Sequence, residues 1–338
     1  MNLLFDIGHP AHVHLFRNYI YYLRDRGHNV FVVSRKKDVT EILLDHFKIE
    51  HFPVTAPAAT RSGMLKELII RSRFIFELHR KHHLDAAFGT SASIGFLRLK
   101  FGVPAYNFNE DDDDVVKLYS YLAYPPATKI FNPDCIRYKK WKDKRVLYPS
   151  YHELAYLHPD NFTPDVNILK SYNLEPEKYI IIRLSALQAH HDSGMRGISS
   201  SLLRSIRKVV KDYQILETHE LKGNNFNPYD IHNILAFAKM IISDSQTMTI
   251  EGSVLGIPAL RINTFIGRST VIGELENRYN LAYGFFPDQE KEIMDTIEYL
   301  ASEKEVINLW REKREVLLRD KINLNLWMIR YFEDQMPA

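Results

Sequence analysis

Three histidines near the N-terminus, in the stretch DIGHPAHVHLF, are the first residues that could carry chemistry. His9, His12 and His14 follow a short apolar run and precede an amphipathic stretch. Neutral imidazoles bind zinc, accept protons in general-base catalysis, or simply cap a helix. Gly8 and Pro10 break the strand before His12 and His14, and neighbouring side chains on one helical turn diverge. A metal ion shared by the three histidines is therefore the least favoured of the three interpretations, and we expect no metal.

A second polar group lies in MIISDSQTMTIEGSVLGIPAL, residues 240–260. We expect a strand ending at residue 243, a turn, and a helix over 249–255, closed by Gly256 with Pro258 beyond it. The free N–H groups and dipole at a helix N-terminus attract anions, and nearby hydroxyls add donors. The alternative is that Asp244 or Ser245 only caps the helix. The candidate ligand-binding residues here are Ser245, Gln246, Thr247, Met248, Thr249 and Glu251.

A long polar loop, RLSALQAHHDSGMRG, covers residues 183–197. Arg183 ends a predicted strand, and the loop then carries His190, His191 and Asp192. Cationic and N–H donors suit the diphosphate that leaves a nucleotide sugar. The alternative is an ordinary polar surface loop, although loops of this length are usually functional.

An acidic run, EDDDD at residues 110–114, follows a predicted strand at 105–108. Glu110 and Asp111 lie nearest the strand end, where they could orient an acceptor hydroxyl or act as acid and base. We expect Asp113 and Asp114 to cap a helix and face solvent. His219 ends another strand at the expected ligand edge. His232 is a weaker candidate that could as easily be a helix-surface residue.

Short apolar runs alternate with amphipathic stretches along the whole chain, which predicts an α/β protein with parallel sheets wrapped by helices. An irregular stretch with several prolines, 145–173, separates two such halves. We expect an N-terminal Rossmann-like domain at 1–160, joined by a C-terminal helix at 320–338, and a second at 170–319. Their sheets should face each other across a ligand cleft. Strands are predicted at 2–6, 29–33, 49–52, 86–88, 105–108, 129–131, 179–184, 214–218, 240–243 and 259–262. The main helices are predicted at 14–26, 64–83, 199–212, 231–238, 291–301, 303–319 and 323–332.

Composition excludes several classes of protein. With 44 Lys+Arg against 42 Asp+Glu, the chain lacks the basic excess of a nucleic-acid binder. Cys135 is the single cysteine, so neither a disulfide nor a CxxC zinc site is expected, and no signal peptide is visible. We expect a cytoplasmic protein. The basic stretch KKWKDKR, residues 139–145, is interpreted as a solvated surface segment, with peripheral contact to the inner face of the membrane as the alternative.

The 240–260 stretch resembles the signature S-D-S-G-G-x-x-E-E-x-x-x-L-G-x-P of the non-hydrolysing UDP-N-acetylglucosamine 2-epimerases, which share the GT-B fold with many glycosyltransferases. Residues 243–245, Glu251, Leu255-Gly256 and Pro258 match it, whereas Gln246-Thr247 replaces the glycine pair. The resemblance implies that Glu251 holds ribose hydroxyls.

The opening resembles transferases that place a histidine at a helix N-terminus, and His12-Val13 is the corresponding pair. The motifs DIGHPAHVH, AHHD and DSQTM are those of domain-of-unknown-function family 354. That likeness implies a GT-B fold over nearly the whole chain.

Together these observations predict a metal-independent glycosyltransferase that needs no cofactor and acts in cell-surface polysaccharide or glycolipid synthesis. Its donor would be a nucleotide sugar, with UDP as the expected nucleotide, bound by the C-terminal half. His12 would deprotonate the acceptor, with His9 and His14 beside it. Two alternatives stay open, a sugar-nucleotide 2-epimerase and a binding protein without catalysis. The acceptor and the oligomeric state are not predicted.

Overall fold

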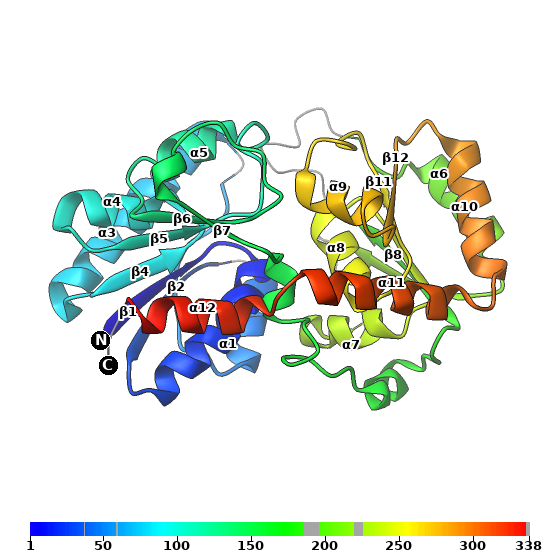
Figure 1. Ribbon diagram of the computed structural model, residues 1–338, viewed down its shortest axis with the longest axis horizontal. Coiled ribbons are helices and arrows are strands. Elements are labelled where there is room, and N and C mark those ends of the chain that lie inside the picture. Colours follow the sequence, from blue (N-terminus) through cyan, green and yellow to red (C-terminus); the bar gives the residue numbers. More distant parts are fainter. Residues whose placement is uncertain (37, 59, 186–195, 220–225, 336–338) are drawn as a thin grey trace. The chain divides into compact units, whose positions relative to one another are not determined.

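The computed structural model describes residues 1–36, 38–58, 60–185, 196–219 and 226–335. The chain forms two compact units (Figure 1). Met1–Tyr156 and the segment that begins at Ile322 make the first unit, and Leu157–Lys321 makes the second. Among the described residues, none of the helices is both long and apolar enough to cross a membrane.

The first unit is built on a parallel sheet whose described strands lie in the order β3-β2-β1-β4-β5-β6-β7. The two central strands, Asn2–Ile7 and Ala86–Gly89, are almost completely buried, as their continuous apolar runs LLF and AAF require. The strands are β1 (Asn2–Ile7), β2 (Asn29–Arg35), β3 (Phe52–Thr55), β4 (Ala86–Gly89), β5 (Ala105–Phe108), β6 (Lys129–Pro133) and β7 (Arg145–Tyr148). The helices are α1 (Pro10–Asp25), α2 (Asp38–His46), α3 (Arg61–His82), α4 (Ala92–Phe101), α5 (Lys117–Ala123) and α12 (Leu324–Glu333).

Helix α1 begins four residues earlier than its apolar pattern predicts. His9 is the N-cap, and its Nδ1 accepts a hydrogen bond from the Ala11 N–H at 3.2 Å. Pro10 occupies the first helical position, where its fixed φ fits and its missing N–H costs nothing. The predicted helix start at residue 14 is therefore wrong, and His12 lies in the first turn of α1.

Helix α12 packs on the first sheet through an aromatic cluster. The Phe332 ring lies 4.9 Å from the rings of Phe88 and Tyr106, and 5.4 Å from that of Phe131. Met328 and Phe332 are buried, as the helical spacing of the apolar residues predicts. The last described helix thus supplies part of the first unit's core.

The second unit contains a parallel sheet with the described strand order β12-β11-β10-β8-β9. Its strands are β8 (Tyr179–Leu184), β9 (Gln214–His219), β10 (Met240–Ser243), β11 (Ala259–Ile262) and β12 (Ala282–Phe285). Its helices are α6 (Ser200–Val209), α7 (Ile231–Ala236), α8 (Gln246–Leu255), α9 (Thr270–Asn277), α10 (Glu290–Ser302) and α11 (Val306–Asp320). The α/β class with parallel sheets is confirmed.

Some elements differ from the predictions. The strand expected at 49–52 runs instead from Phe52 to Thr55, and Pro53 is tolerated there because β3 is an edge strand. The stretch from Arg145 to Tyr148 was expected to be irregular but forms β7, the opposite edge strand of the same sheet. Both errors concern short edge strands, where local pattern is weakest.

Candidate functional site

The candidate residues gather where each sheet reverses its strand order, which is the usual ligand position in open α/β sheets. In the first sheet the reversal lies between β1 and β4, and in the second between β8 and β10. The loops that follow these four strands leave the carboxyl edge of the sheet at the two reversal points. Each unit therefore has its own candidate site.

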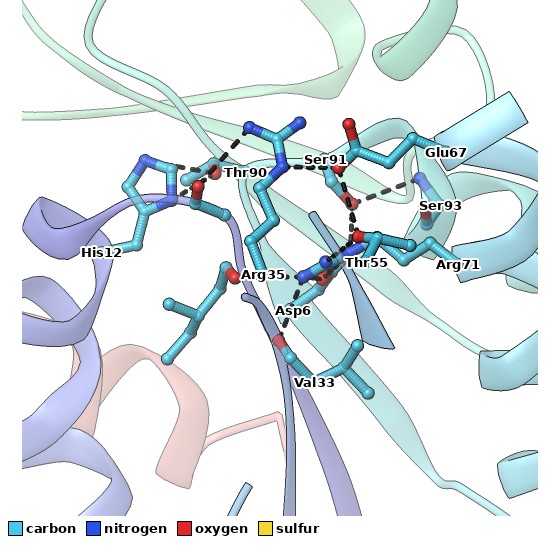
Figure 2. Close-up of polar contacts among 12 residues, drawn as sticks. Asp6, His12, Val33, Arg35, Thr55, Glu67, Arg71, Thr90, Ser91 and Ser93 are labelled. Carbon is cyan, nitrogen blue, oxygen red and sulfur yellow. Dashed lines mark hydrogen bonds and ion pairs between the residues drawn. The ribbon is translucent and has the colours of Figure 1, made fainter. Parts of the chain in front are cut away.

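A buried ion pair lies beneath the candidate site of the first unit (Figure 2). The Arg71 Nε donates to Asp6 Oδ1 at 2.5 Å, and both residues are almost completely buried. The Arg71 guanidinium also donates to the carbonyls of Ile7, the last residue of β1, and Val33 in β2. Ser91, the N-cap of α4, donates to the second Asp6 oxygen. The pair thereby joins β1, β2, α3 and α4, although sequence patterns did not single it out.

A second arginine lies above this pair with part of its side chain in solvent. The Arg35 Nε donates to Glu67 Oε1 at 2.5 Å, and Thr55 donates to the same oxygen. The Arg35 side chain is 37% exposed, whereas that of Glu67 is 7% exposed. Arg35 thus places a positive charge at the carboxyl edge close to Gly8, whose carbonyl accepts from its Nη1 at 3.5 Å.

His12 is held at this edge in a form that can accept a proton. Its Nδ1 shares a 2.8 Å hydrogen bond with the Thr90 hydroxyl, just beyond β4 (Figure 2). Burial lowers the pKa of His12 well below 6.5, and the neighbouring His9, His152 and Arg35 lower it further. An imidazole with such a pKa is neutral at neutral pH, as a general base must be.

The other two histidines of the opening stretch have different surroundings. His9 is exposed at the N-cap, with its ring centroid 5.8 Å from that of His12. His14 is 4% exposed, and its ring stacks on Tyr156 at 5.1 Å. Because His14 lies in the core, the geometry does not favour three histidines on one ion, nor a contact between His14 and substrate.

A histidine that the sequence did not single out lies beside Glu110. The Nδ1 of His152 is 3.6 Å from Glu110 Oε2, in a 3₁₀ turn at His152–Ala155. Burial lowers the pKa of His152 to about 3, and its Nε2 has no hydrogen-bond partner among the described residues. No sequence pattern marks His152, since only folding brings the chain after β7 to the end of β5.

The acidic run divides into structural and solvent-facing residues. The Asp111 N–H is bound by the Asn109 side chain at 2.6 Å, which fixes the turn after β5. Both Asp113 oxygens accept from the buried Arg145 at 2.6 Å. The expectation that Asp113 caps a helix and faces solvent is wrong, because Arg145 in β7 requires a counter-charge. Asp114 is exposed.

In the second unit, Asp244 organises the chain after β8 and β10. It is 4% exposed and accepts from the N–H and the hydroxyl of Ser185 at 2.6 and 2.8 Å. Burial raises the pKa of Asp244, whereas the Ser185 bonds and Arg183 act in the opposite direction. Gly197 lies directly against this carboxylate, where a Cβ atom would collide with it. Asp244 therefore fixes the backbone at Ser185 and leaves no room for a side chain at position 197.

Helix α8 begins at Gln246, three residues before the predicted start, with Ser245 as its N-cap. The first N–H groups of a helix have no partner within it, so the turn at 246–248 presents donors at the carboxyl edge. Ser245, Gln246, Thr247 and Met248 are partly exposed there. Thr249 is fully buried, and its hydroxyl donates to the Ser245 carbonyl at 2.7 Å. The hydroxyl of Thr249 is therefore used within the helix.

Glu251 and His232 form a buried pair. The His232 Nε2 lies 3.0 Å from Glu251 Oε1, and both residues are more than nine-tenths buried. His232 is thus buried, which contradicts the alternative that it lies on the helix surface. The local sequence does not predict this burial, because His232 lies on α7 and its partner Glu251 lies on α8.

The remaining candidates lie at the ends of β8 and β9. Arg183 is partly exposed and pairs in register with Ser243 of β10. The His219 Nε2 lies 2.7 Å from Glu217 Oε1. His190, His191 and Asp192 lie outside the described residues.

The two parallel sheets, each with polar side chains at its reversal point, have the architecture of the GT-B fold. The chain belongs to the family described as protein of unknown function (DUF354), which matches residues 1–304. A comparison with curated proteins finds no match.

Solved structures of other proteins share the fold. S. aureus MnaA, solved with UDP, has a TM-score of 0.70 and 12% identity, covering 100% of this chain and 98% of that one. The spinosyn forosaminyltransferase SpnP has a TM-score of 0.67 and 11% identity, covering 100% of both chains. The M. jannaschii UDP-GlcNAc 2-epimerase, bound to UDP-GlcNAc and UDP, has a TM-score of 0.64 and 12% identity, covering 90% of this chain and 94% of that one.

Proposed function

We propose that this protein is a glycosyltransferase that uses a nucleotide sugar, with UDP as the nucleotide, and requires no metal ion. The first unit would bind the acceptor and supply His12 as the general base, while Glu110 and Asp111 orient the acceptor hydroxyl. The second unit would bind the nucleotide. A role in cell-surface polysaccharide or glycolipid synthesis is part of this proposal.

The observation that carries the proposal is the position and environment of His12. Burial lowers its pKa, it is bonded to Thr90 and it lies at the strand reversal of the first sheet. A base at that position can take the hydroxyl proton as the acceptor oxygen attacks the anomeric carbon. The nucleoside diphosphate then leaves with the bonding electron pair.

For the nucleotide, the support comes from α8. Its N-terminal N–H groups and dipole can hold a diphosphate, with hydroxyls of Ser245 and Thr247 as further donors. Glu251, held by His232, would accept from the ribose hydroxyls. Arg183 at the end of β8 would neutralise charge on the leaving group.

A sugar-nucleotide 2-epimerase is the second candidate, favoured by one observation. The Glu110 carboxylate beside the neutral His152 forms an acid–base pair of the kind that could move a C2 proton. Incubation with UDP-sugars in deuterated water distinguishes the two reactions. Deuterium at C2 without an acceptor marks an epimerase, while turnover only with an acceptor marks a transferase.

The first experiment is a calorimetric titration with nucleoside diphosphates, followed by turnover assays with UDP-sugars and a broad acceptor panel, with and without a chelator. Binding of none of the nucleotides would refute the nucleotide site. Tight binding without turnover would instead identify a binding protein. Loss of activity with chelator would refute the metal-independent mechanism.

A further inference from the structure

Helix α5 carries an apolar face that the fold leaves in solvent. Leu118, Tyr121 and Leu122 are 61%, 55% and 41% exposed. Their spacing of three and four residues places them on one side of the helix. The opposite side is anchored, since Ala123 packs with the buried Tyr124 in the core cluster beneath. The exposure therefore belongs to a well-packed helix and is not a frayed end.

Leu68 of α3 and Tyr119 of α5 pack against the same core cluster. Helix α4 packs against both α3 and α5 (Figure 1). We call the exposed side chains of α5, which are Leu118, Tyr121 and Leu122, the apolar patch.

Lysines border the apolar patch. The Lys140 Nζ donates to the Tyr121 hydroxyl at 2.5 Å and lies 4.6 Å from the centre of its ring. Trp141 holds this loop in place, because its ring lies 5.4 Å from those of Tyr121 and Tyr124. Lys117, Lys139 and Lys142 are also exposed, against the exposed acids Asp114 and Asp143. The border is positively charged overall.

Only part of the basic stretch 139–145 is available for this role. Lys144 donates to the backbone carbonyls of Pro125 and Ala127, and Arg145 is buried against Asp113. Lys139, Lys140 and Lys142 are the exposed lysines of the stretch. The fold thus separates structural cations from those that face solvent.

We propose that the apolar patch and its lysines form a docking surface for an anionic lipid bilayer. Leucine and tyrosine side chains insert at the boundary between headgroups and acyl chains, while lysines contact anionic headgroups. A second copy of this chain is a poorer occupant, because two copies would bring two positively charged borders into one interface. This inference does not depend on the proposed glycosyl transfer.

Vesicle flotation tests the proposal with the full chain. We expect binding to vesicles of phosphatidylcholine with phosphatidylglycerol, weaker binding to phosphatidylcholine alone, and loss of binding as salt is raised. Lys140→Gln and Lys142→Gln should each weaken binding about fivefold, because a lysine near an anionic surface contributes about a factor of five. The double variant Leu118→Glu/Leu122→Glu should weaken it by at least tenfold.

Matched controls lie on the second unit. Leu309→Glu, on the exposed face of α11, and Lys208→Gln/Lys211→Gln, at the end of α6, should leave vesicle binding unchanged. All substituted side chains are exposed, so thermal unfolding should be unchanged in each variant. Absence of wild-type binding to anionic vesicles overturns the proposal, as does equal binding to neutral vesicles. Undiminished binding of the Leu118→Glu/Leu122→Glu variant overturns it too, and so does a wild-type dimer that this variant dissociates.

Discussion

Substitution of His152 by glutamine should remove a large part of the acid sensitivity of the first unit. In the folded state burial lowers the pKa of His152 to about 3, whereas an unfolded histidine has a pKa near ~6.5. Below pH 6.5 the unfolded chain therefore binds a proton at His152 that the folded chain does not. The stability associated with the neutral imidazole is present above pH 6.5 and is lost as the pH falls.

The magnitude follows from the two pKa values. Each pH unit between them changes the free energy of unfolding by up to about 1.4 kcal/mol. From pH 7 to pH 5 the contribution of His152 amounts to a loss of about 2 kcal/mol. Because glutamine does not titrate, the His152→Gln variant should lose about 2 kcal/mol less than the wild type over the same interval.

The assay is urea unfolding at both pH values, followed by tryptophan fluorescence. Trp141 and Trp327 report on the first unit. His46→Gln, at the exposed end of α2, is the matched control and should lose as much stability as the wild type. If His152→Gln loses the same free energy as the wild type between pH 7 and pH 5, the buried neutral imidazole is refuted.

The remaining predictions concern the two candidate sites. His12→Ala should lower turnover about 10²–10⁴-fold while nucleotide affinity stays unchanged, which steady-state kinetics and calorimetry measure separately; normal turnover would refute the base. Glu251→Ala should weaken nucleotide binding by about 1.5–3 kcal/mol and, because His232 loses its buried partner, lower the free energy of unfolding by about 1–3 kcal/mol. Unchanged affinity for every nucleoside diphosphate would contradict that role. Asp6→Asn should destabilise the protein by about 3–5 kcal/mol in urea titrations, since it leaves the Arg71 charge buried without its counter-ion; a loss below about 1 kcal/mol would mean that the pair is not buried as described.

A matched control exists for the last of these substitutions. Glu67→Gln removes the carboxylate beside Arg35, whose side chain is partly in solvent. Water can solvate Arg35 but cannot reach Arg71, so the loss of stability should be smaller than in Asp6→Asn. Equal losses in the two variants would argue against this difference in solvation.

The sequence predicts much of the fold because its signals are local. Alternating apolar and amphipathic stretches identify strands such as 105–108 and 240–243 to the residue. Gly256 ends α8 in a left-handed conformation, which glycine adopts without strain. The apolar pattern places the start of α1 at residue 14, four residues late, because Pro10 and the polar residues of the first turn carry no apolar periodicity.

The candidate sites are only partly predictable. Chemistry-bearing residues that follow a strand, such as His12 and Asp244, can be located from sequence because the carboxyl ends of parallel strands meet at one edge. The partners of these residues come from distant segments. Thr90 meets His12 across 78 positions, and Arg71 meets Asp6 across 65.

The sequence by itself determined the α/β class, the strand-to-helix loops that carry polar residues, and the family resemblance. Each of these depends on periodicity or on neighbours in the chain. Only the tertiary structure decided which polar groups are buried and with whom. His232 and Glu251 form one pair, His152 lies beside Glu110, and Asp113 binds Arg145. Burial and pairing arise when segments distant in sequence pack together, and they set protonation states that residue types alone do not reveal.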